Sequence, residues 1–355
     1  MKIGVLTFHF AYNYGAMLQA YALSNYIDGI SGMECEVIDY RPNKINSLYR
    51  PKMIDFYKKP LLNIKRSIKK RISCTSHANF EKFLKQQLKQ SKRAVNDKEF
   101  STIIKKYDAV FVGSDQVWNP QITGGDKNYL LYKGSNSLKK FSYAASIGAN
   151  SINEEWKNSI SKFLKSFKEI SVREESGRKL LKDIQPELCV DVISDPVFLL
   201  STEEWRKLEK AVPRVDKFIL FYSLSRNIEL EQETKRLSEK MGIKIVSIHP
   251  LFKSKVGECK CDIGPLQFLW LIDNAEYVCT DSFHATAFSV IFRKNIIVEY
   301  DNEKGNRIAN LLNEFGVDVW MNTEKCGKYK FEDIDNKLKK LEHNGREFII
   351  RCIGE

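Results

Sequence analysis

An apolar run that ends in a polar turn and resumes as a helix constrains this chain more than any other feature. From Tyr277 to Cys279 the residues are typical of a buried strand, and an apolar helix is expected from about Ala285 onward, through Phe292. In an open α/β sheet, ligands collect at the carboxyl ends of strands, where helix N-termini present free N–H groups. The stretch therefore predicts one strand-turn-helix unit of an α/β domain, with a ligand at its turn.

The turn of this unit holds Asp281, Ser282 and His284. A carboxylate, a hydroxyl and an imidazole at that place suit an anionic substrate and proton transfer. A structural interpretation is equally open, because Asp281 or Ser282 would cap the following helix and His284 would be a satisfied core histidine.

The same unit recurs along the chain, as short apolar runs alternate with helical patterns. Strands are expected at 2–8, 34–40, 107–113, 140–147, 170–173, 188–190, 217–223, 244–248, 277–279 and 296–299. Helices are expected at 16–30, 154–168, 174–181, 229–241, 264–273, 306–315 and 331–341, another helix is expected to open at Ser201 with an N-cap signature, and residues 251–262 are expected to form a loop.

Residues 211–216 are predicted to form a hinge between two blocks of alternating strands and helices. We expect an α/β fold with two Rossmann-like domains facing a cleft, at 1–210 and 217–330, and a helical tail at 331–355. A basic helical insertion is expected in the first domain, at about 53–92. A single barrel fits less well, because the insertion and the hinge break any eightfold regularity.

Composition narrows the class of protein. With 355 residues, 43% of them hydrophobic and 12% aromatic, the chain can bury two ordinary cores. No apolar run is long enough to cross a membrane. The eight cysteines are scattered, and the close pair Cys259 and Cys261 lacks zinc-site spacing. We therefore expect reduced thiols, no metal site and a cytoplasmic protein.

The net charge of +12 is unevenly distributed. Between Lys58 and Arg93 there are twelve Lys and Arg residues against one acid, Glu81. A solvated helix face is the first interpretation, and peripheral contact with an anionic membrane surface is the second. Nucleic acid is not expected as a partner, because the segment lacks a nucleic-acid module and interleaved aromatic residues.

Three stretches together carry a family resemblance. They are LTFH from Leu6 with NYGAMLQA from Asn13, VGSDQVWN from Val112, and DSFH from Asp281 with its helix. In this order and spacing the chain resembles the polysaccharide pyruvyltransferase family, from Met1 to about Asn313. The resemblance implies a two-domain fold like that of the GT-B glycosyltransferases. It also implies phosphoenolpyruvate as donor, and as product a pyruvate ketal on a sugar of a surface polysaccharide or its lipid-linked precursor.

The resemblance also implies roles for particular residues. The family's catalytic histidine corresponds to His284, and Arg173 looks like the family's second basic position. Members with assigned chemistry often carry arginine two residues before the histidine, where this chain has Ser282. Either another cation must then bind the carboxylate or phosphate of the donor, or the donor is a different compound. Arg307, near the start of a predicted helix, is a further candidate for that cation.

Phosphoenolpyruvate carries a carboxylate and a phosphate, so a site for it needs two anion cradles and an acid near the methylene carbon. The two-pronged guanidinium groups of arginine and the N-termini of helices are suited to bind these anionic groups. His284 is the expected acid or stabiliser of the leaving phosphate, and Asp115 or Asp281 the expected base. The remaining substrate-binding candidates, for which capping or surface roles stay open, are Ser114, Gln116, Asn13, Gly15, His9 and His249. The route needs no metal and no further cofactor.

Two other functions remain open at this stage. A GT-B glycosyltransferase with a nucleotide-sugar donor would have the same fold, so only the donor separates the two. A non-catalytic protein that binds acidic glycans or a membrane would use the basic segment and would tolerate loss of His284.

Overall fold

The computed structural model describes residues 1–43, 45–46, 75–149, 151–213, 215–225, 227–250, 253–299, 306–316 and 331–354. The predicted basic insertion falls inside these ranges only from residue 75 onward, where α4 (Thr75–Gln87) is a helix. Its earlier part lies outside the described residues, so the insertion's helical character there and its contact with membranes stay predictions.

The first sheet is wholly parallel and begins at the N-terminus. Its order is β2-β1-β3-β4-β5-β6. The second strand is added on one side of β1 and all later strands on the other side, so the strand order reverses between β1 and β3. Parallel strands that reverse their order in this way open a crevice at their carboxyl ends. The six strands are β1 (Lys2–Leu6), β2 (Glu34–Val37), β3 (Ala109–Val112), β4 (Lys139–Ala145), β5 (Glu169–Val172) and β6 (Asp191–Val192).

Helices cover both faces of this sheet, as the period-two alternation of its strands requires. In β3, Ala109 and Phe111 face a cluster that contains Phe348 and Ile349, whereas Val110 faces the opposite cluster. The first face is covered by α1 (Tyr14–Asp28) and α14 (Phe331–Gly354). The second is covered by α5 (Asp97–Ile104), α7 (Glu154–Phe163) and α8 (Glu175–Ile184).

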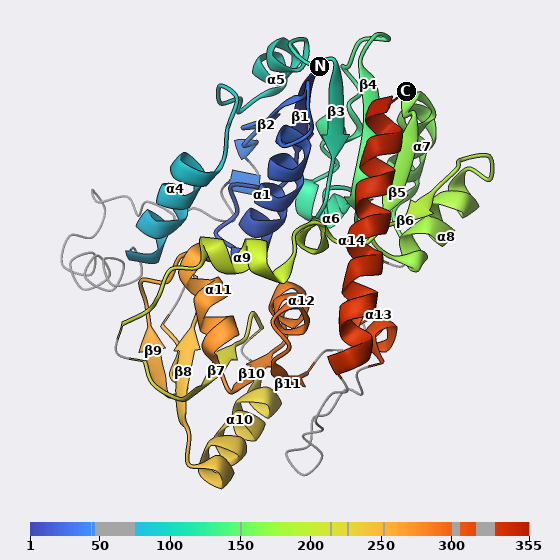
Figure 1. Cartoon of the computed structure of the whole chain (residues 1–355). Coiled ribbons are helices and arrows are strands. Elements are labelled where there is room, and N and C mark those ends of the chain that lie inside the picture. The colour runs from blue at the N-terminus through green and yellow to red at the C-terminus, as the bar shows by residue number, and fades with distance from the viewer. Residues whose placement is uncertain are drawn as a thin grey trace, which may run out of the picture.

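The second sheet is also parallel, with the order β11-β10-β7-β8-β9 and its reversal between β7 and β10. Its strands are β7 (Phe218–Tyr222), β8 (Lys244–Ile248), β9 (Glu258–Lys260), β10 (Tyr277–Thr280) and β11 (Asn295–Val298). One face is covered by α10 (Ile228–Met241), and the other by α11 (Pro265–Asn274) and α12 (Phe283–Ile291), with α13 (Asn306–Phe315) beside α12. The prediction of two Rossmann-like domains is confirmed (Figure 1).

Three local predictions were wrong. Residues 251–262 were expected to be loop, but they contain the edge strand β9, which has no apolar run to reveal it. The strand expected at 188–190 lies just after that range, as β6 at Asp191–Val192. Leu188 and Val190 are buried, as strand residues often are, but the pairing with β5 begins only at Asp191. The helix expected from about Ala285 begins at Phe283.

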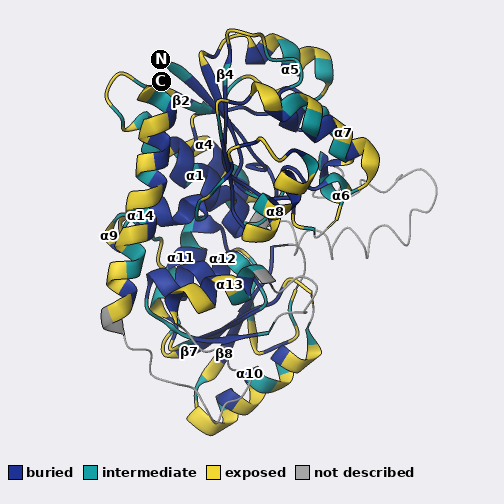
Figure 2. Ribbon diagram, turned by 90° about the vertical axis from the view of Figure 1, so that its right-hand side faces the viewer, coloured by how far each residue is buried: buried dark blue, intermediate teal, exposed yellow. Residues whose placement is uncertain are grey.

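The two domains share a continuous apolar core. The ring of Tyr14, at the start of α1, stacks on Phe268 of α11 at 4.6 Å and on Phe80 of α4 at 5.0 Å. Figure 2 shows the buried helices α1, α11 and α12 lying between the sheets. The helical tail α14 runs back along both domains and packs its last turns on the first sheet (Figure 1).

The segment between the sheets carries two short helices, η3 (Pro196–Leu199) and α9 (Thr202–Leu208). Ser201 caps α9 through a complete capping box with Glu204, as the sequence predicted. Trp205 of α9 packs edge-on against Phe288 of α12 at 5.0 Å, so α9 lies against the second domain although it was assigned to the first. Among the described helices, none combines the length and apolar character needed to cross a bilayer.

Candidate active site

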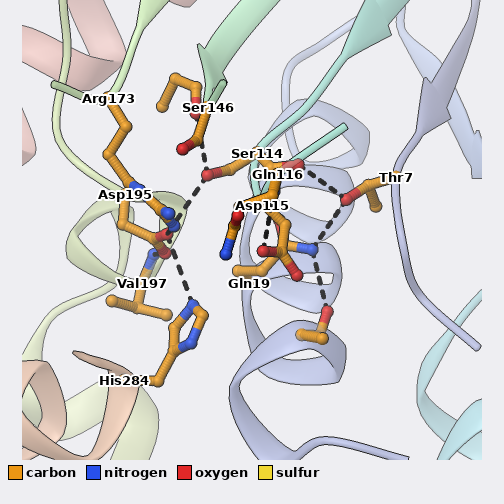
Figure 3. Close-up of polar contacts among 12 residues, drawn as sticks. Thr7, Gln19, Ser114, Asp115, Gln116, Ser146, Arg173, Asp195, Val197 and His284 are labelled. Atoms are coloured by element: carbon orange, nitrogen blue, oxygen red, sulfur yellow. Dashed lines mark hydrogen bonds and ion pairs between the residues drawn. The ribbon is translucent and has the colours of Figure 1, made fainter. Parts of the chain in front are cut away.

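Side chains from both domains meet at the carboxyl ends of the two sheets, around a carboxylate that the sequence analysis did not select. Asp195 lies just before η3 and is 1% exposed. Its Oδ2 accepts hydrogen bonds from Arg173 Nη1 at 2.8 Å and Ser114 Oγ at 3.2 Å. The Nε2 atom of His284 stands 3.4 Å from the same oxygen. Figure 3 shows these three side chains directed at Asp195.

The charge of this buried carboxylate is held by its neighbours. Burial on its own would raise the pKa of Asp195, but His284 and Arg173 together hold it well below its usual range. Burial would lower the pKa of Arg173, but the carboxylates of Glu174, Asp195 and Asp115 raise it above its ordinary value. Asp195 and Arg173 are therefore an ion pair that is stabilised inside the protein by the charges around it.

Arg173 follows β5 and uses only part of its guanidinium within the protein. Besides the contact with Asp195, its Nε donates to Glu174 Oε1 at 3.0 Å, and its Cζ lies 4.7 Å from the centre of the Phe283 ring. Its Nη2 is buried and has no hydrogen-bond partner within the described residues. An unsatisfied charged donor in such a place is a binding position for an anion.

His284 lies inside the first turn of α12 rather than in the turn before it, where the sequence placed it, and is 9% exposed. Its Nε2 is buried, and although it stands within ion-pair distance of Asp195, it makes no hydrogen bond of good geometry within the described part of the chain. The ring packs against the backbone of Gly15 in α1. The space beside Gly15 that the sequence analysis assigned to a ligand is thus occupied by the histidine.

The other two polar residues of this turn serve the fold. Ser282 is the N-cap of α12, with Oγ accepting from Ala285 N at 3.5 Å. Asp281 accepts four hydrogen bonds from the loop after β7, through Ser223 Oγ, Leu224 N and both Ser225 N and Oγ. Its carboxylate therefore bridges the ends of β10 and β7, where the sheet reverses its order.

The turn after β3 is the counterpart in the first domain. The Gly113–Ser114 peptide bond is cis, and Asp115 has a φ of 66°. The Asp115 Oδ1 accepts from Gln116 N at 2.8 Å, and the Gln116 side chain accepts from Asn119 Nδ2 at 2.7 Å. The Ser114 carbonyl accepts from Thr7 Oγ1 at 3.0 Å, which joins the ends of β3 and β1 at the first reversal point.

Arg307, near the start of α13, is the second cation of the site. Burial and the charge of Arg173 lower the pKa of Arg307, with Glu174, Asp115 and Asp195 acting in the opposite direction. Arg307 makes no hydrogen bond or ion pair with any residue of the described ranges. Two guanidinium groups near enough to repel each other, each with unused donors, are what a polyanionic ligand would neutralise.

Three predicted candidates lie outside this cluster. Asn13 caps α1 by accepting from Ala16 N at 3.2 Å. His9 is fully buried, with Nε2 2.9 Å from Asp39 Oδ1 and Nδ1 3.2 Å from the Thr7 carbonyl. His249 lies at the end of β8 and lines a pocket of about 180 Å³ with Phe221, Ser223 and Lys253.

The donor set of the site favours anions over metal ions. Within the described residues, no group of three His, Cys, Asp or Glu side chains is arranged to hold a metal. Arginine nitrogens and helix N-terminal amides instead bind carboxylate and phosphate oxygens.

Known structures share this fold at low sequence identity. The UDP-GlcNAc 2-epimerase of Neisseria meningitidis, solved with UDP-GlcNAc bound, is 12% identical over 99% of both chains, with a TM-score of 0.52. The Methanocaldococcus jannaschii UDP-GlcNAc 2-epimerase, in complex with UDP-GlcNAc and UDP, is 14% identical over 100% of this chain and 99% of that one, also at 0.52. At such identity the likeness shows the fold alone, which is GT-B-like, as predicted. No curated protein matches the chain.

The match of the sequence to a family model identifies the family more specifically than the shared fold does. A family model described as "Polysaccharide pyruvyl transferase" matches residues 13–301, from the N-cap of α1 to just past β11. The match includes every described strand except β1, the hinge between the sheets and every residue that contacts Asp195, and ends before α13 and α14. On that extent of match the chain belongs to the polysaccharide pyruvyl transferase family.

Proposed function

We propose that this protein transfers a pyruvyl group from phosphoenolpyruvate to a sugar and forms a pyruvate ketal. The observation that carries the proposal is the pair Arg173 and Arg307, which lie near enough for the charge of Arg173 to lower the pKa of Arg307 and which both have unused donors within the described residues. Phosphoenolpyruvate has two anionic groups and one carbon that must be protonated. The site offers two guanidinium groups and one imidazole.

The donor's two anionic groups would divide between the two arginines. Arg173 is fixed by Glu174 and Asp195, so its free Nη2 points in one direction and suits the smaller, planar carboxylate. Arg307 has no such restraint within the described residues and suits the phosphate, whose charge moves away as the bond to carbon breaks. The first-turn amides of α12 add partial positive charge beside His284.

Arg307 also accounts for the serine at position 282. The family resemblance implies an arginine there, whereas Ser282 is buried and committed to capping α12. A guanidinium from α13 supplies the missing positive charge from another direction. This keeps phosphoenolpyruvate as the proposed donor in spite of the substitution.

Proton transfer then completes the ketal in two steps, an addition at C2 and a substitution of phosphate at the same carbon. His284 donates a proton to the donor's methylene carbon, which leaves C2 electrophilic, and a sugar hydroxyl oxygen bonds to C2. Asp115, half-buried at the end of β3, takes the proton that this hydroxyl loses. A second hydroxyl of the same sugar bonds to C2, the C2–O bond to phosphate breaks, and inorganic phosphate leaves with the second proton.

The acceptor and its place in the cell belong to the same proposal. A sugar of a surface polysaccharide or of its lipid-linked precursor would offer the two hydroxyls, with the reaction on the cytoplasmic side of the membrane. The basic segment between Lys58 and Arg93 would bring the protein to an anionic membrane surface.

A donor screen tests the proposal directly. Total lipid-linked sugars from the source cells would be incubated with the protein and either phosphoenolpyruvate or a set of nucleotide-sugars, and the products weighed by mass spectrometry. A mass gain of a pyruvate ketal with release of phosphate supports the proposal. A hexose-sized gain from a nucleotide-sugar alone would replace it with a glycosyltransferase, the activity for which the shared fold leaves room.

A further inference from the structure

We infer that Asp195 is a positioning residue that fixes both Arg173 and His284 for the reaction, an inference that rests on the proposed function. Its Oδ2 faces Arg173, Ser114 and His284, which come from the turns after β5, β3 and β10. No other carboxylate oxygen in the described residues is in contact with side chains from all three turns. One atom therefore sets the relative places of groups from both domains.

The two oxygens of Asp195 have separate tasks. Oδ1 accepts from Val197 N at 3.2 Å and so caps η3, which belongs to the fold. Oδ2 serves only the cluster. This division makes the positioning role separable by substitution, because an asparagine can keep the capping oxygen and change the other atom alone.

The contact with Arg173 decides which of its donors meets the ligand. Nε is occupied by Glu174 and Nη1 by Asp195, so Nη2 remains. The planar guanidinium cannot turn without losing both bonds. An anion bound at Nη2 is thereby held at one place relative to the neighbouring histidine.

The contact with His284 decides where that ring carries its proton. A carboxylate oxygen only accepts, so the nitrogen that faces it, Nε2, must bear hydrogen. At 3.4 Å and without good hydrogen-bond geometry, that hydrogen is attracted by the carboxylate but is not engaged in a hydrogen bond. It remains available to a substrate atom that enters between the residues.

Asp195→Asn tests the inference, with Asp126→Asn as the matched control. Asp126 caps the short helix η1 (Lys127–Leu130) through Asn128 N at 3.0 Å and accepts from Tyr40 Oη at 2.7 Å. It is thus an aspartate with the same capping task and no contact with the cluster. The readouts are phosphate release at saturating phosphoenolpyruvate, KM for phosphoenolpyruvate, and Tm.

In Asp195→Asn an amide NH₂ would face donors of Arg173 and His284, so both side chains would move. We expect kcat to fall about a hundredfold, the scale of a misplacement near 1 Å, and KM to rise less. Asp126→Asn should stay within about threefold of the wild type in both, because this half-buried cap makes none of the contacts that join the cluster. If the two variants lose Tm alike and neither loses kcat, Asp195 is only a cap and the inference is overturned.

If Asp195→Asn does not fold, nitrogen NMR of the wild type tests the positioning role of Asp195 instead. The chain has five histidines, and the His284 signal is the one that His284→Gln removes. We expect its Nε2 to be protonated at neutral pH without any ligand; an unprotonated Nε2 would overturn the inference. Because this readout needs no phosphoenolpyruvate, it stays separate from the proposed function, which fails instead if the wild type neither binds phosphoenolpyruvate nor releases phosphate.

Discussion

Gly15 lies against His284 so closely that a Cβ built on it would stand 2.0 Å from Cγ of the imidazole. The first residues of α1 and α12 thus approach each other across the domain boundary with only the imidazole of His284 between them. Because that contact is with a rigid ring, a methyl group at position 15 must displace the histidine or the start of α1.

Gly15→Ala should therefore lower activity although alanine favours helices by roughly 1 kcal/mol over glycine. We expect phosphate release to fall by at least about tenfold, since the ring of His284, the proposed acid, would move by the order of 1 Å. Gly29→Ala, at the other end of α1, is the control, because its nearest atoms would be 3.4 Å away and its φ is −75°. Equal activity of the two variants would contradict the contact.

His284→Gln should fold, keep most of its donor affinity and lose at least about a hundredfold in kcat, the usual cost of a lost acid catalyst. Donor affinity persists because Arg173 and Arg307 hold the anion. Circular dichroism, calorimetric binding of phosphoenolpyruvate and phosphate release on one preparation check this. His343→Gln, on the exposed face of α14, is the control. Near-normal turnover of folded His284→Gln would show that this turn is not the catalytic centre.

Ser282→Ala should affect stability more than catalysis. The hydroxyl caps α12 and is not replaced by alanine, so unfolding should become easier by about 0.5–2 kcal/mol. Chemical denaturation measures that loss, and kcat should change by less than about threefold if the residue only caps. A large drop in kcat with unchanged stability would instead place Ser282 on the substrate.

Arg307→Gln and Arg173→Gln should differ in their cost to the fold. We expect phosphoenolpyruvate to raise the Tm of the wild type, and both substitutions to abolish that rise. Only Arg173→Gln should also lower the Tm of the free protein, because it leaves Glu174 and Asp195 buried without their cation. Arg178→Gln, at an exposed pair with Glu175, is the control. A ligand-dependent shift that survives in Arg307→Gln would remove that residue from the donor site.

Glu209 gives a pH dependence that lies outside the site. Burial, and then the nearby charge of Asp273, raise the pKa of Glu209 to about 7. Since the folded state favours the protonated form, the penalty for ionising Glu209 is absent below the unfolded value of about 4.3 and complete above about 7. Glu209→Gln should therefore raise Tm at pH 8 and leave it unchanged at pH 4, whereas exposed Glu203→Gln should do neither.

Most strands and helices followed from local pattern, because side-chain periodicity and caps act over a few residues. The helix α7 begins at Glu154 and the helix α10 ends at Met241, as the ranges expected from the sequence had them. The missed strand β9 has only three residues, and its membership of the sheet depends on pairing with β8 rather than on its own composition.

The sequence by itself determined that Arg173, Ser114 and His284 stand at strand ends, where a substrate can reach them, and that two sheets would carry them. It could not single out Asp195, whose local setting before a proline is that of an ordinary cap. Its partners lie 22 residues away at Arg173 and 81 at Ser114. The packing of the two domains decides which side chains contact the same buried oxygen. Burial removes these groups from water, so each charge then depends on its neighbours for stabilisation.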